Sequence, residues 1–204
     1  IAEGDTQISG FLEGADALAT LAAFEAMGVP IDQLGDGKLI VKGRGLHGLQ
    51  APVESLYVGN SGTSMRLLAG LLAGQSFSST LTGDVSLTGR PMNRVALPLR
   101  EMGAEIVTAA EGRPPLEIAG KAALRGIDYV LPIASAQVKS CLLLAGLYAS
   151  GRTTVTEPAP TRDHTERMLQ GFGYVVERNG PTASVLGGGK LTATAIDIPA
   201  DISS

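Results

Sequence analysis

Ser79-Thr80-Leu81-Thr82 is a short strand-like segment that recurs twice in the chain, as Thr6-Gln7-Ile8-Ser9 and as Thr153-Thr154-Val155-Thr156. Each copy places one aliphatic residue among polar, mostly hydroxyl-bearing residues, a pattern that favours a half-buried strand. The aliphatic residues of successive copies are 73 and 74 residues apart. Self-similarity at a nearly fixed spacing indicates a chain built from repeated structural units.

The residues that follow each copy repeat as well. A helix that ends on glycine is expected first, because glycine is the usual residue where a helix ends in the left-handed conformation. These helices run from Asp16 to Met27 before Gly28, from Arg94 to Met102 before Gly103, and from Glu166 to Phe172 before Gly173. A strand pair is expected next: Leu39 to Lys42 with Leu56 to Val58, Leu116 to Ile118 with Tyr129 to Leu131, and Ser184 to Leu186 with Ala195 to Ile198.

This order predicts an α/β fold of three βαβαββ units in one globular domain, with units of about 1–58, 59–131 and 132–204. The second and third units begin with hydroxyl-rich helix starts, Ser61-Gly62-Thr63-Ser64 and Ser135-Ala136-Gln137, whereas the first unit has no counterpart. We therefore expect its first helix to lie upstream of Ile1, and residues 198–204 to approach a further helix. The chain is then a domain of a longer protein, and the face left by the absent helix could drive self-association.

Composition limits the partners that the chain could have. Its 204 residues are 44% hydrophobic and 18% charged with a net charge of −4, which argues against nucleic acid or an anionic membrane surface as main partner. The apolar runs are too short to span a bilayer. The single cysteine, Cys141, lies in an apolar run and is expected to be a buried structural thiol, which fits a reducing, cytoplasmic setting.

Gly59-Asn60-Ser61-Gly62-Thr63-Ser64-Met65-Arg66 precedes the apolar run from Leu67 to Ala73 and has the outline of an anion site. Small residues let the backbone approach a ligand, and a helix that begins here would direct free N–H groups at phosphate or carboxylate. Hydroxyl and amide side chains before an apolar run also cap ordinary helices. For this segment alone, plain capping is the simpler interpretation.

If the units surround an approximate threefold axis, the starts at Ser61 and Ser135, and a third at Thr161-Arg162-Asp163, would converge on one end of the domain. Arginine pairs bidentately with carboxylate and phosphate, so Arg66, Arg90 and Arg162 are candidates. We expect Arg66 to form a structural pair with a carboxylate, and Lys139 either to serve the site or to extend from an apolar helix to solvent. His164 has no second histidine nearby, so no metal site is expected.

Four segments, in order along the chain, resemble motifs of the 5-enolpyruvylshikimate-3-phosphate synthase family. The segment from Gly59 to Arg66 resembles the motif on the phosphoenolpyruvate side, and Arg90-Pro91-Met92 resembles its second anchor. Ser135-Ala136-Gln137-Val138-Lys139 and Arg162-Asp163-His164-Thr165-Glu166 resemble two motifs of the class II branch. The resemblance covers essentially the whole chain.

The resemblance implies one half of a two-domain enolpyruvyl transferase, an inverse α/β barrel half whose partner half closes over two anionic substrates. The family transfers the enolpyruvyl group of phosphoenolpyruvate to the 5-hydroxyl of shikimate 3-phosphate, in chorismate and aromatic amino-acid biosynthesis, without metal or cofactor. By this resemblance the phosphoenolpyruvate site contains Gly62, Arg90, Gln137, Asn60 and Thr63, and the shikimate 3-phosphate site contains Ser135, Ala136, Gln137 and Arg162.

Two parts of the family pattern are absent from these 204 residues: the N-terminal Lys-Ser…Arg segment and the second half, with its acidic residue, lysine and arginines. The catalytic set is therefore incomplete, and we expect no turnover by the chain alone. The alternatives are a UDP-N-acetylglucosamine enolpyruvyl transferase domain, which depends on a cysteine in an exposed loop, and a noncatalytic anion-binding module. The resemblance also implies that Gly62 leaves open the space used by the inhibitor glyphosate.

Overall fold

The computed structural model describes residues 1–120 and 123–199, so most of the segment expected to approach a further helix lies outside the described residues. The helices are α1 (Ala15–Ala26), α2 (Gly62–Ala73), α3 (Val85–Thr88), α4 (Asn93–Glu101), α5 (Ala136–Gly146) and α6 (His164–Gly171), with a 3₁₀ turn at Ala110–Gly112. The strands are β1 (Glu3–Ser9), β2 (Ile31–Gly35), β3 (Lys38–Arg44), β4 (Leu56–Tyr57), β5 (Ser79–Thr82), β6 (Ile106–Ala109), β7 (Arg113–Ile118), β8 (Asp128–Val130), β9 (Arg152–Thr156), β10 (Val176–Asn179), β11 (Thr182–Leu186) and β12 (Ala195–Asp197).

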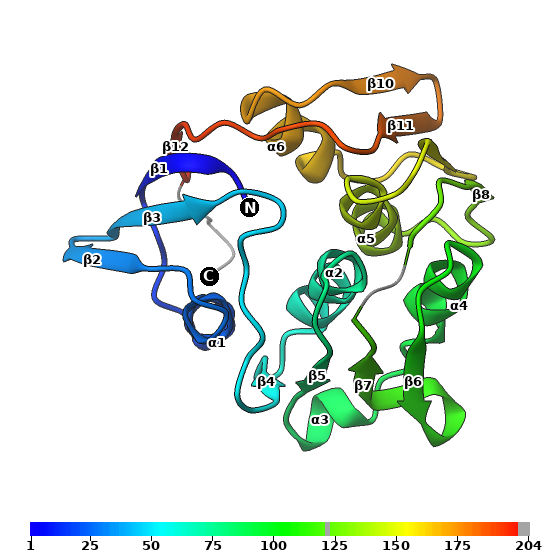
Figure 1. Cartoon of the computed structure of the whole chain (residues 1–204), viewed down its shortest axis with the longest axis horizontal. Helices are drawn as coiled ribbons and strands as arrows, with labels where there is room; N and C mark the ends of the chain where they lie inside the picture. The colour runs from blue at the N-terminus through cyan, green and yellow to red at the C-terminus, as the bar shows by residue number, and fades with distance from the viewer. Residues whose placement is uncertain (121–122, 200–204) are drawn as a thin grey trace.

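Within the described residues, the strands form three four-stranded sheets that share one topology. The strand orders are β4-β5-β7-β6, β8-β9-β11-β10 and β12-β1-β3-β2. In every sheet the first two strands pair parallel and the other neighbours pair antiparallel. Figure 1 shows the sheets toward the outside of the molecule, with α2 and α5 near its centre. This threefold repetition confirms the predicted α/β fold of repeated units.

The parallel pairs tie each unit to the next. Parallel neighbours need a crossover connection, and α2 supplies it between β4 and β5, as α5 does between β8 and β9. In the remaining sheet, β12 pairs parallel with β1, with Ile196 opposite Ile8. The last described strand therefore closes onto the first, and the three sheets form a ring in sequence order.

The strand segments expected from sequence are present, but their pairing was predicted wrongly. In each expected pair the two strands belong to different sheets: β3 pairs with β1 and β2, whereas β4 pairs with β5. The same split separates β7 from β8 and β11 from β12. The true hairpin partners are β2, β6 and β10, which follow directly after the helices that end on glycine.

All three expected helix ends are confirmed. Gly28, Gly103 and Gly173 follow α1, α4 and α6 with φ of 80°, 100° and 80°, values that favour glycine. After each of these glycines the chain turns back and enters β2, β6 or β10, the strands that the sequence pattern missed.

The two crossover helices pack closely in the core, and Gly70 on α2 makes this approach possible. A Cβ atom at Gly70 would lie 2.1 Å from the carbonyl oxygen of Cys141 on α5. Cys141 is fully buried and burial raises the pKa of its thiol, as expected for a structural cysteine. The close packing of α2 against α5 brings two sets of predicted site residues together.

An apolar groove lies on the sheet that has no crossover helix among the described residues. Its volume is about 520 Å³. It is bounded by β1 and β3 on one side and by α1, α2, α5 and α6 on the others, with Ile8, Val41, Leu144 and Met168 in its lining. On the other two sheets α2 contacts β5 and β7, and α5 contacts β9 and β11. The groove therefore occupies the place that a third crossover helix would fill.

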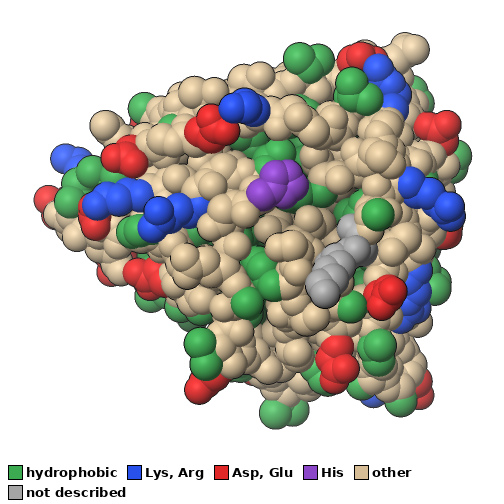
Figure 2. Space-filling model, viewed as in Figure 1, with side chains coloured by type: hydrophobic (Ala, Val, Ile, Leu, Met, Phe, Trp, Pro, Cys, Tyr) green, Lys and Arg blue, Asp and Glu red, His purple; other side chains and the backbone are tan. Residues whose placement is uncertain are grey.

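The surface carries charges of both signs. Figure 2 shows acidic and basic side chains spread around the edge of the face in view, without one large patch of a single sign. Among the described residues, none of the helices combines the length and the apolar character needed to cross a bilayer.

Candidate functional site

The starts of α2 and α5 carry the hydroxyl caps that the sequence predicts. Ser61 precedes α2, and its Oγ accepts from the backbone N–H of Ser64 at 3.2 Å. Ser135 precedes α5 in the same way, and its Oγ accepts from the N–H of Val138 at 3.3 Å. Both helix starts are therefore capped by a serine hydroxyl, as in ordinary helices.

Gln137 links the two helix starts through both ends of its amide. Its Oε1 accepts from Nη1 of Arg66 at 2.6 Å, and its Nε2 donates to Oγ1 of Thr63 at 2.7 Å. The two contacts fix which end of the amide points in which direction. The predicted residues Thr63 and Gln137, 74 residues apart, thus lie in direct contact.

Two guanidinium groups lie close to the backbone of Gly62. A Cβ atom placed there would be 2.9 Å from Nη1 of Arg66 and 3.2 Å from Nη1 of Arg90. Partial burial, followed by the nearby charges of Arg90 and Arg94, lowers the pKa of Arg66. Cations held together at a helix start form a positive site that an anion would stabilise.

Asn60 and Asp84 hold the second of these guanidinium groups. Arg90 Nη2 donates to Oδ1 of Asn60, and Nδ2 of Asn60 donates to Oδ2 of Asp84 at 2.8 Å. Asp84 also caps α3 by accepting from the N–H of Leu87 at 2.7 Å. That N–H and the Asn60 amide lower the pKa of the Asp84 carboxyl. Arg90 is thus anchored at one Nη group, while the Gly62 backbone lies beside the other.

The structure corrects the prediction for Arg66, which was expected to pair with a carboxylate. Its Nη1 instead donates to Gln137 and to the carbonyl oxygen of Gly62, at 3.3 Å for the latter. Both partners are neutral, so the positive charge of Arg66 is not cancelled by these contacts. Arg66 therefore forms hydrogen bonds with two predicted site residues, Gly62 and Gln137.

The third expected helix start was placed wrongly. The start of α6 follows β9 and precedes β10, so it matches α1 and α4 in their units and not α2 and α5. Arg162, in the loop before α6, is exposed, and no hydrogen bond joins it to another predicted site residue among the described ones. Ser135 and Ala136, by contrast, directly precede Gln137 at the start of α5.

Lys139 also departs from expectation, because it neither lines the candidate site nor reaches solvent. Its side chain is 1% exposed, and Nζ lies 2.8 Å from Oε2 of Glu157 and 2.7 Å from Oε1 of Glu166. The lysine therefore joins α5 to both ends of the segment that carries Arg162. Sequence spacing gave no sign of this buried cluster.

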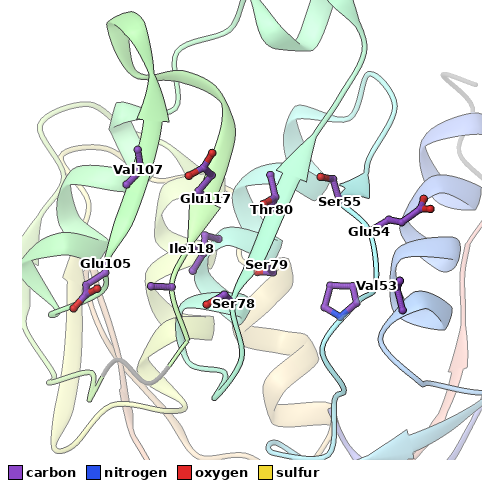
Figure 3. Close-up of a pocket in the computed structure, with 12 residues that line it drawn as sticks. Val53, Glu54, Ser55, Ser78, Ser79, Thr80, Glu105, Val107, Glu117 and Ile118 are labelled. Atoms are coloured by element: carbon purple, nitrogen blue, oxygen red, sulfur yellow. The ribbon is translucent and has the colours of Figure 1, made fainter.

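A cavity of about 860 Å³ lies elsewhere, on the sheet that contains β5 and β7. Figure 3 shows three carboxylates at this cavity, those of Glu54, Glu105 and Glu117, that point in different directions. None of the predicted site residues lines it. Among the described residues, no group of three or more potential metal ligands gathers at this or any other place.

Comparison with known proteins identifies the relatives of this chain. The family model for EPSP synthase (3-phosphoshikimate 1-carboxyvinyltransferase) matches residues 1–204. The 3-phosphoshikimate 1-carboxyvinyltransferase of Methylococcus capsulatus is 65% identical over all of this chain and 47% of its own length. That of Alkalilimnicola ehrlichii is 66% identical over all of this chain and 46% of its length.

Solved structures with the same fold are also EPSP synthases. The structure of EPSP synthase from Acinetobacter baumannii superposes with a TM-score of 0.97 at 60% identity, over all of this chain and 46% of that one. The chain spans about half the length of the relatives that it matches. The family match over residues 1–204, the high identity and the near-identical fold agree, and the chain belongs to the EPSP synthase family.

Proposed function

We propose that residues 1–204 are a single substrate-binding domain of a 3-phosphoshikimate 1-carboxyvinyltransferase, built from three units of about 1–58, 59–131 and 132–204. The complete enzyme would transfer the enolpyruvyl group of phosphoenolpyruvate to the 5-hydroxyl of shikimate 3-phosphate and release phosphate. The family match carries the reaction class. The contact of Gln137 with both Thr63 and Arg66 carries the site, because it joins the two halves of the proposed pocket.

On the phosphoenolpyruvate side, the proposed ligand lies over Gly62. Its phosphate and carboxylate would face Arg90 and the N–H groups at the start of α2, where the absence of a side chain at Gly62 leaves room. Asn60 orients Arg90, and Thr63 orients Gln137. The uncancelled charge of Arg66 adds attraction for an anion.

On the shikimate 3-phosphate side, the Ser135 hydroxyl, the Ala136 backbone and Arg162 would bind the ligand, and Gln137 would reach both substrates. Ser135 is only partly buried, so its hydroxyl can serve a ligand in addition to the helix cap. Arg162 is exposed, and within residues 1–120 and 123–199 no side-chain hydrogen bond or ion pair engages its guanidinium group. Both proposed sites work by charge and hydrogen bonding, and neither needs a metal or another cofactor.

The binding proposal is tested by titrating shikimate 3-phosphate into the purified chain by calorimetry. We expect heat at millimolar ligand, and Arg162→Met weakens the affinity roughly 10- to 100-fold, the usual value of a hydrogen bond to a charged group. Arg167→Met, at another exposed arginine of the same region, is the matched control and leaves the affinity unchanged. No heat with the unaltered chain would refute the binding site.

The same proposal predicts no turnover by this chain alone, because the remaining half of the relatives' length would supply the acid–base groups. Phosphate release is assayed with the purified chain and with a covalent fusion to the missing half of a close relative. We expect release only from the fusion. Appreciable enolpyruvyl transfer by the 204 residues alone would refute this part of the proposal.

We further propose that a helix from outside these 204 residues covers the apolar groove in the longer protein. The groove's place on the β12-β1-β3-β2 sheet supports this, since α2 and α5 hold the same place on the other two sheets. Left open, the groove would make the isolated chain self-associate. The mixed surface charge and the buried single thiol support a cytoplasmic protein without nucleic acid or membrane as partner.

A further inference from the structure

Lys139, Glu157 and Glu166 form a charged cluster that is almost completely shielded from water. Lys139 and Glu166 are each 1% exposed, and Glu157 is 9% exposed. One ammonium faces two carboxylates at 2.7 and 2.8 Å. Oε1 of Glu157 accepts a further hydrogen bond from Oγ1 of Thr161, whereas Oε2 of Glu166 has no partner among the described residues.

The three members come from three separate places in the chain. Lys139 lies on the first turn of α5, and its N–H donates to the carbonyl oxygen of Ser135 at 3.1 Å. Glu157 directly follows β9, and Glu166 lies on the first turn of α6. Both ends of the 157–166 segment are thus held by one ammonium. That segment contains Arg162, the predicted partner of shikimate 3-phosphate, which no hydrogen bond joins to the other predicted site residues among the described ones.

Two further hydrogen bonds help to hold the 157–166 segment in place. Thr165 Oγ1 donates to Oγ of Ser140 at 2.7 Å, one residue along from the Glu166–Lys139 pair on both helices. Thr161 directly precedes Arg162, and its hydroxyl donates a hydrogen bond to the carboxylate of Glu157. The segment is thereby fixed to α5 at Lys139 and Ser140, the second and third residues after Gln137.

Stability alone is a weak explanation for such a cluster. Removing charges from water is costly, and replacing a buried ion pair or triad by apolar residues of similar volume is often neutral or stabilising. The cost is more easily explained by what the cluster fixes in space. The ion pair of Lys42 with Asp32 is about half exposed to water, at 46% and 48%, and so avoids most of this cost.

We propose that Lys139, together with Glu157 and Glu166, is a positioning residue that sets the place of Arg162 relative to Ser135 and Gln137. The inference rests on the proposed function, since it gives Arg162 a ligand to meet. The cluster itself touches no substrate. By holding the 157–166 segment against α5, the cluster keeps Arg162 at a fixed distance from the start of α5, so that both can bind one ligand.

The test uses the triple variant K139M/E157Q/E166Q, which removes all three charges and leaves no lone buried ion. We expect the dissociation constant for shikimate 3-phosphate to rise about tenfold, as follows from a displaced binding group. Affinity for phosphoenolpyruvate and the thermal midpoint change little. A variant that stays folded and binds shikimate 3-phosphate as the unaltered chain does would overturn the inference. Lys42→Met, the same substitution in an exposed pair, is the control.

A second pair of variants covers the case in which the triple variant does not fold. Thr161 is partly exposed, so its substitution spares the core. Thr161→Val removes the hydroxyl that bonds Glu157 and should weaken shikimate 3-phosphate binding about threefold, whereas Thr161→Ser keeps the hydroxyl and the affinity. Equal affinities for the two variants would count against the inference.

One readout is independent of any substrate. Backbone ¹⁵N relaxation of Thr161, Arg162 and Asp163 should give rigid order parameters near roughly 0.85 in the unaltered chain and values falling toward about 0.6 in the triple variant or in Thr161→Val. Unchanged order parameters in those variants overturn the positioning role. If the unaltered chain binds no shikimate 3-phosphate, the proposed function fails, and relaxation alone still decides this inference.

Discussion

The backbone of Gly62 lies beneath two guanidinium groups, and a methyl group there would meet both of them. The nearest contact would be 2.9 Å, to Nη1 of Arg66. We expect Gly62→Ala to push the flexible ends of both arginine side chains aside and to raise the dissociation constant for phosphoenolpyruvate about fivefold, since a hydrogen bond to a charged group contributes roughly 1.5–3 kcal/mol and is weakened when its donor is displaced. Affinity for glyphosate, which the family resemblance assigns to the same proposed site, should fall too.

Binding to the Gly62→Ala variant is measured by competition between labelled phosphoenolpyruvate and glyphosate, in a protein completed with its second half. Gly14→Ala is the matched control, because a Cβ atom at Gly14 meets nothing within 4 Å and its φ of −75° suits alanine. An inhibition constant for glyphosate that does not change on Gly62→Ala would exclude this account of the pocket.

Asp84 gives the candidate site a pH dependence of known sign. The Leu87 N–H and the Asn60 amide keep its pKa below the value of about 3.9 found in unfolded chains. Its stabilising contribution is therefore complete above that value and is lost as the pH falls through the lower folded pKa. The stability advantage of the unaltered chain over Asp84→Asn should shrink as the pH falls below about 4.

Thermal midpoints of the unaltered chain and Asp84→Asn, recorded from neutral pH downward, measure this difference directly. Other carboxyl groups titrate in both proteins and cancel in the comparison. A difference that stays constant through the acid range would mean that Asp84 gains nothing from its two donors.

The residues that the sequence placed wrongly have partners that are distant in the chain. Arg66 bonds Gln137 across 71 residues, and Lys139 bonds Glu157 across 18. Composition and spacing describe what a residue can do on its own helix, where an arginine suggests a carboxylate partner and a lysine suggests solvent. Which groups meet across the core depends on how α2 packs on α5, and Gly70 sets that packing through a backbone contact.

At the scale of the elements, α2 and α5 share a capping device and differ in their proposed ligand. Ser61→Ala and Ser135→Ala each remove a side-chain cap and should lower the free energy of unfolding by about 1 kcal/mol. Ser135→Ala alone should also weaken shikimate 3-phosphate binding, because Ser61 is buried and is not proposed to touch that ligand. Chemical denaturation and calorimetry measure the two effects separately.

The paired caps serve as controls for each other. If Ser61→Ala weakens shikimate 3-phosphate binding as much as Ser135→Ala, the loss reflects a frayed helix start and the Ser135 hydroxyl has no role of its own. If neither variant loses stability, capping is not what the two hydroxyls contribute.

The sequence placed nine of the twelve described strands but missed β2, β6 and β10, and it assigned the wrong strand partners. β1, β5 and β9 fall on the segments expected from the repeat. The missed strands β2 and β10 are joined to β3 and β11 by the two-residue turns Asp36-Gly37 and Gly180-Pro181, and Asp-Gly and turns that begin with glycine are hairpin signals in their own right. Asp36 and Gly37 indeed have φ of 51° and 67° there. Pairing β3 with β4, and β11 with β12, leaves no role for these turns, which explains why both the turns and the strands before them were missed.

At the scale of the whole molecule, each unit contributes its last strand to the sheet of another unit, and this exchange of strands links the three sheets into a ring. β4 and β8 each leave one unit and open the next sheet, and β12 completes the sheet that β1 began. Two of the three sheets have a crossover helix packed on them. The third sheet carries an apolar groove of about 520 Å³ instead. The strands therefore complete the ring, whereas one of the three helix positions inside it is unfilled among the described residues.

We expect that groove to make the purified 204-residue chain self-associate reversibly, because apolar surface that water must cover is buried when two copies meet. Sedimentation velocity over a concentration series measures the effect. Met168→Lys, at a lining residue that is 43% exposed, should return the chain to a monomer, and Val175→Lys, at a 73% exposed residue outside the lining, should not. A fusion that supplies an amphipathic helix ahead of Ile1 should also suppress association. A chain that remains monomeric up to millimolar concentration would show that the groove does not drive contact between copies.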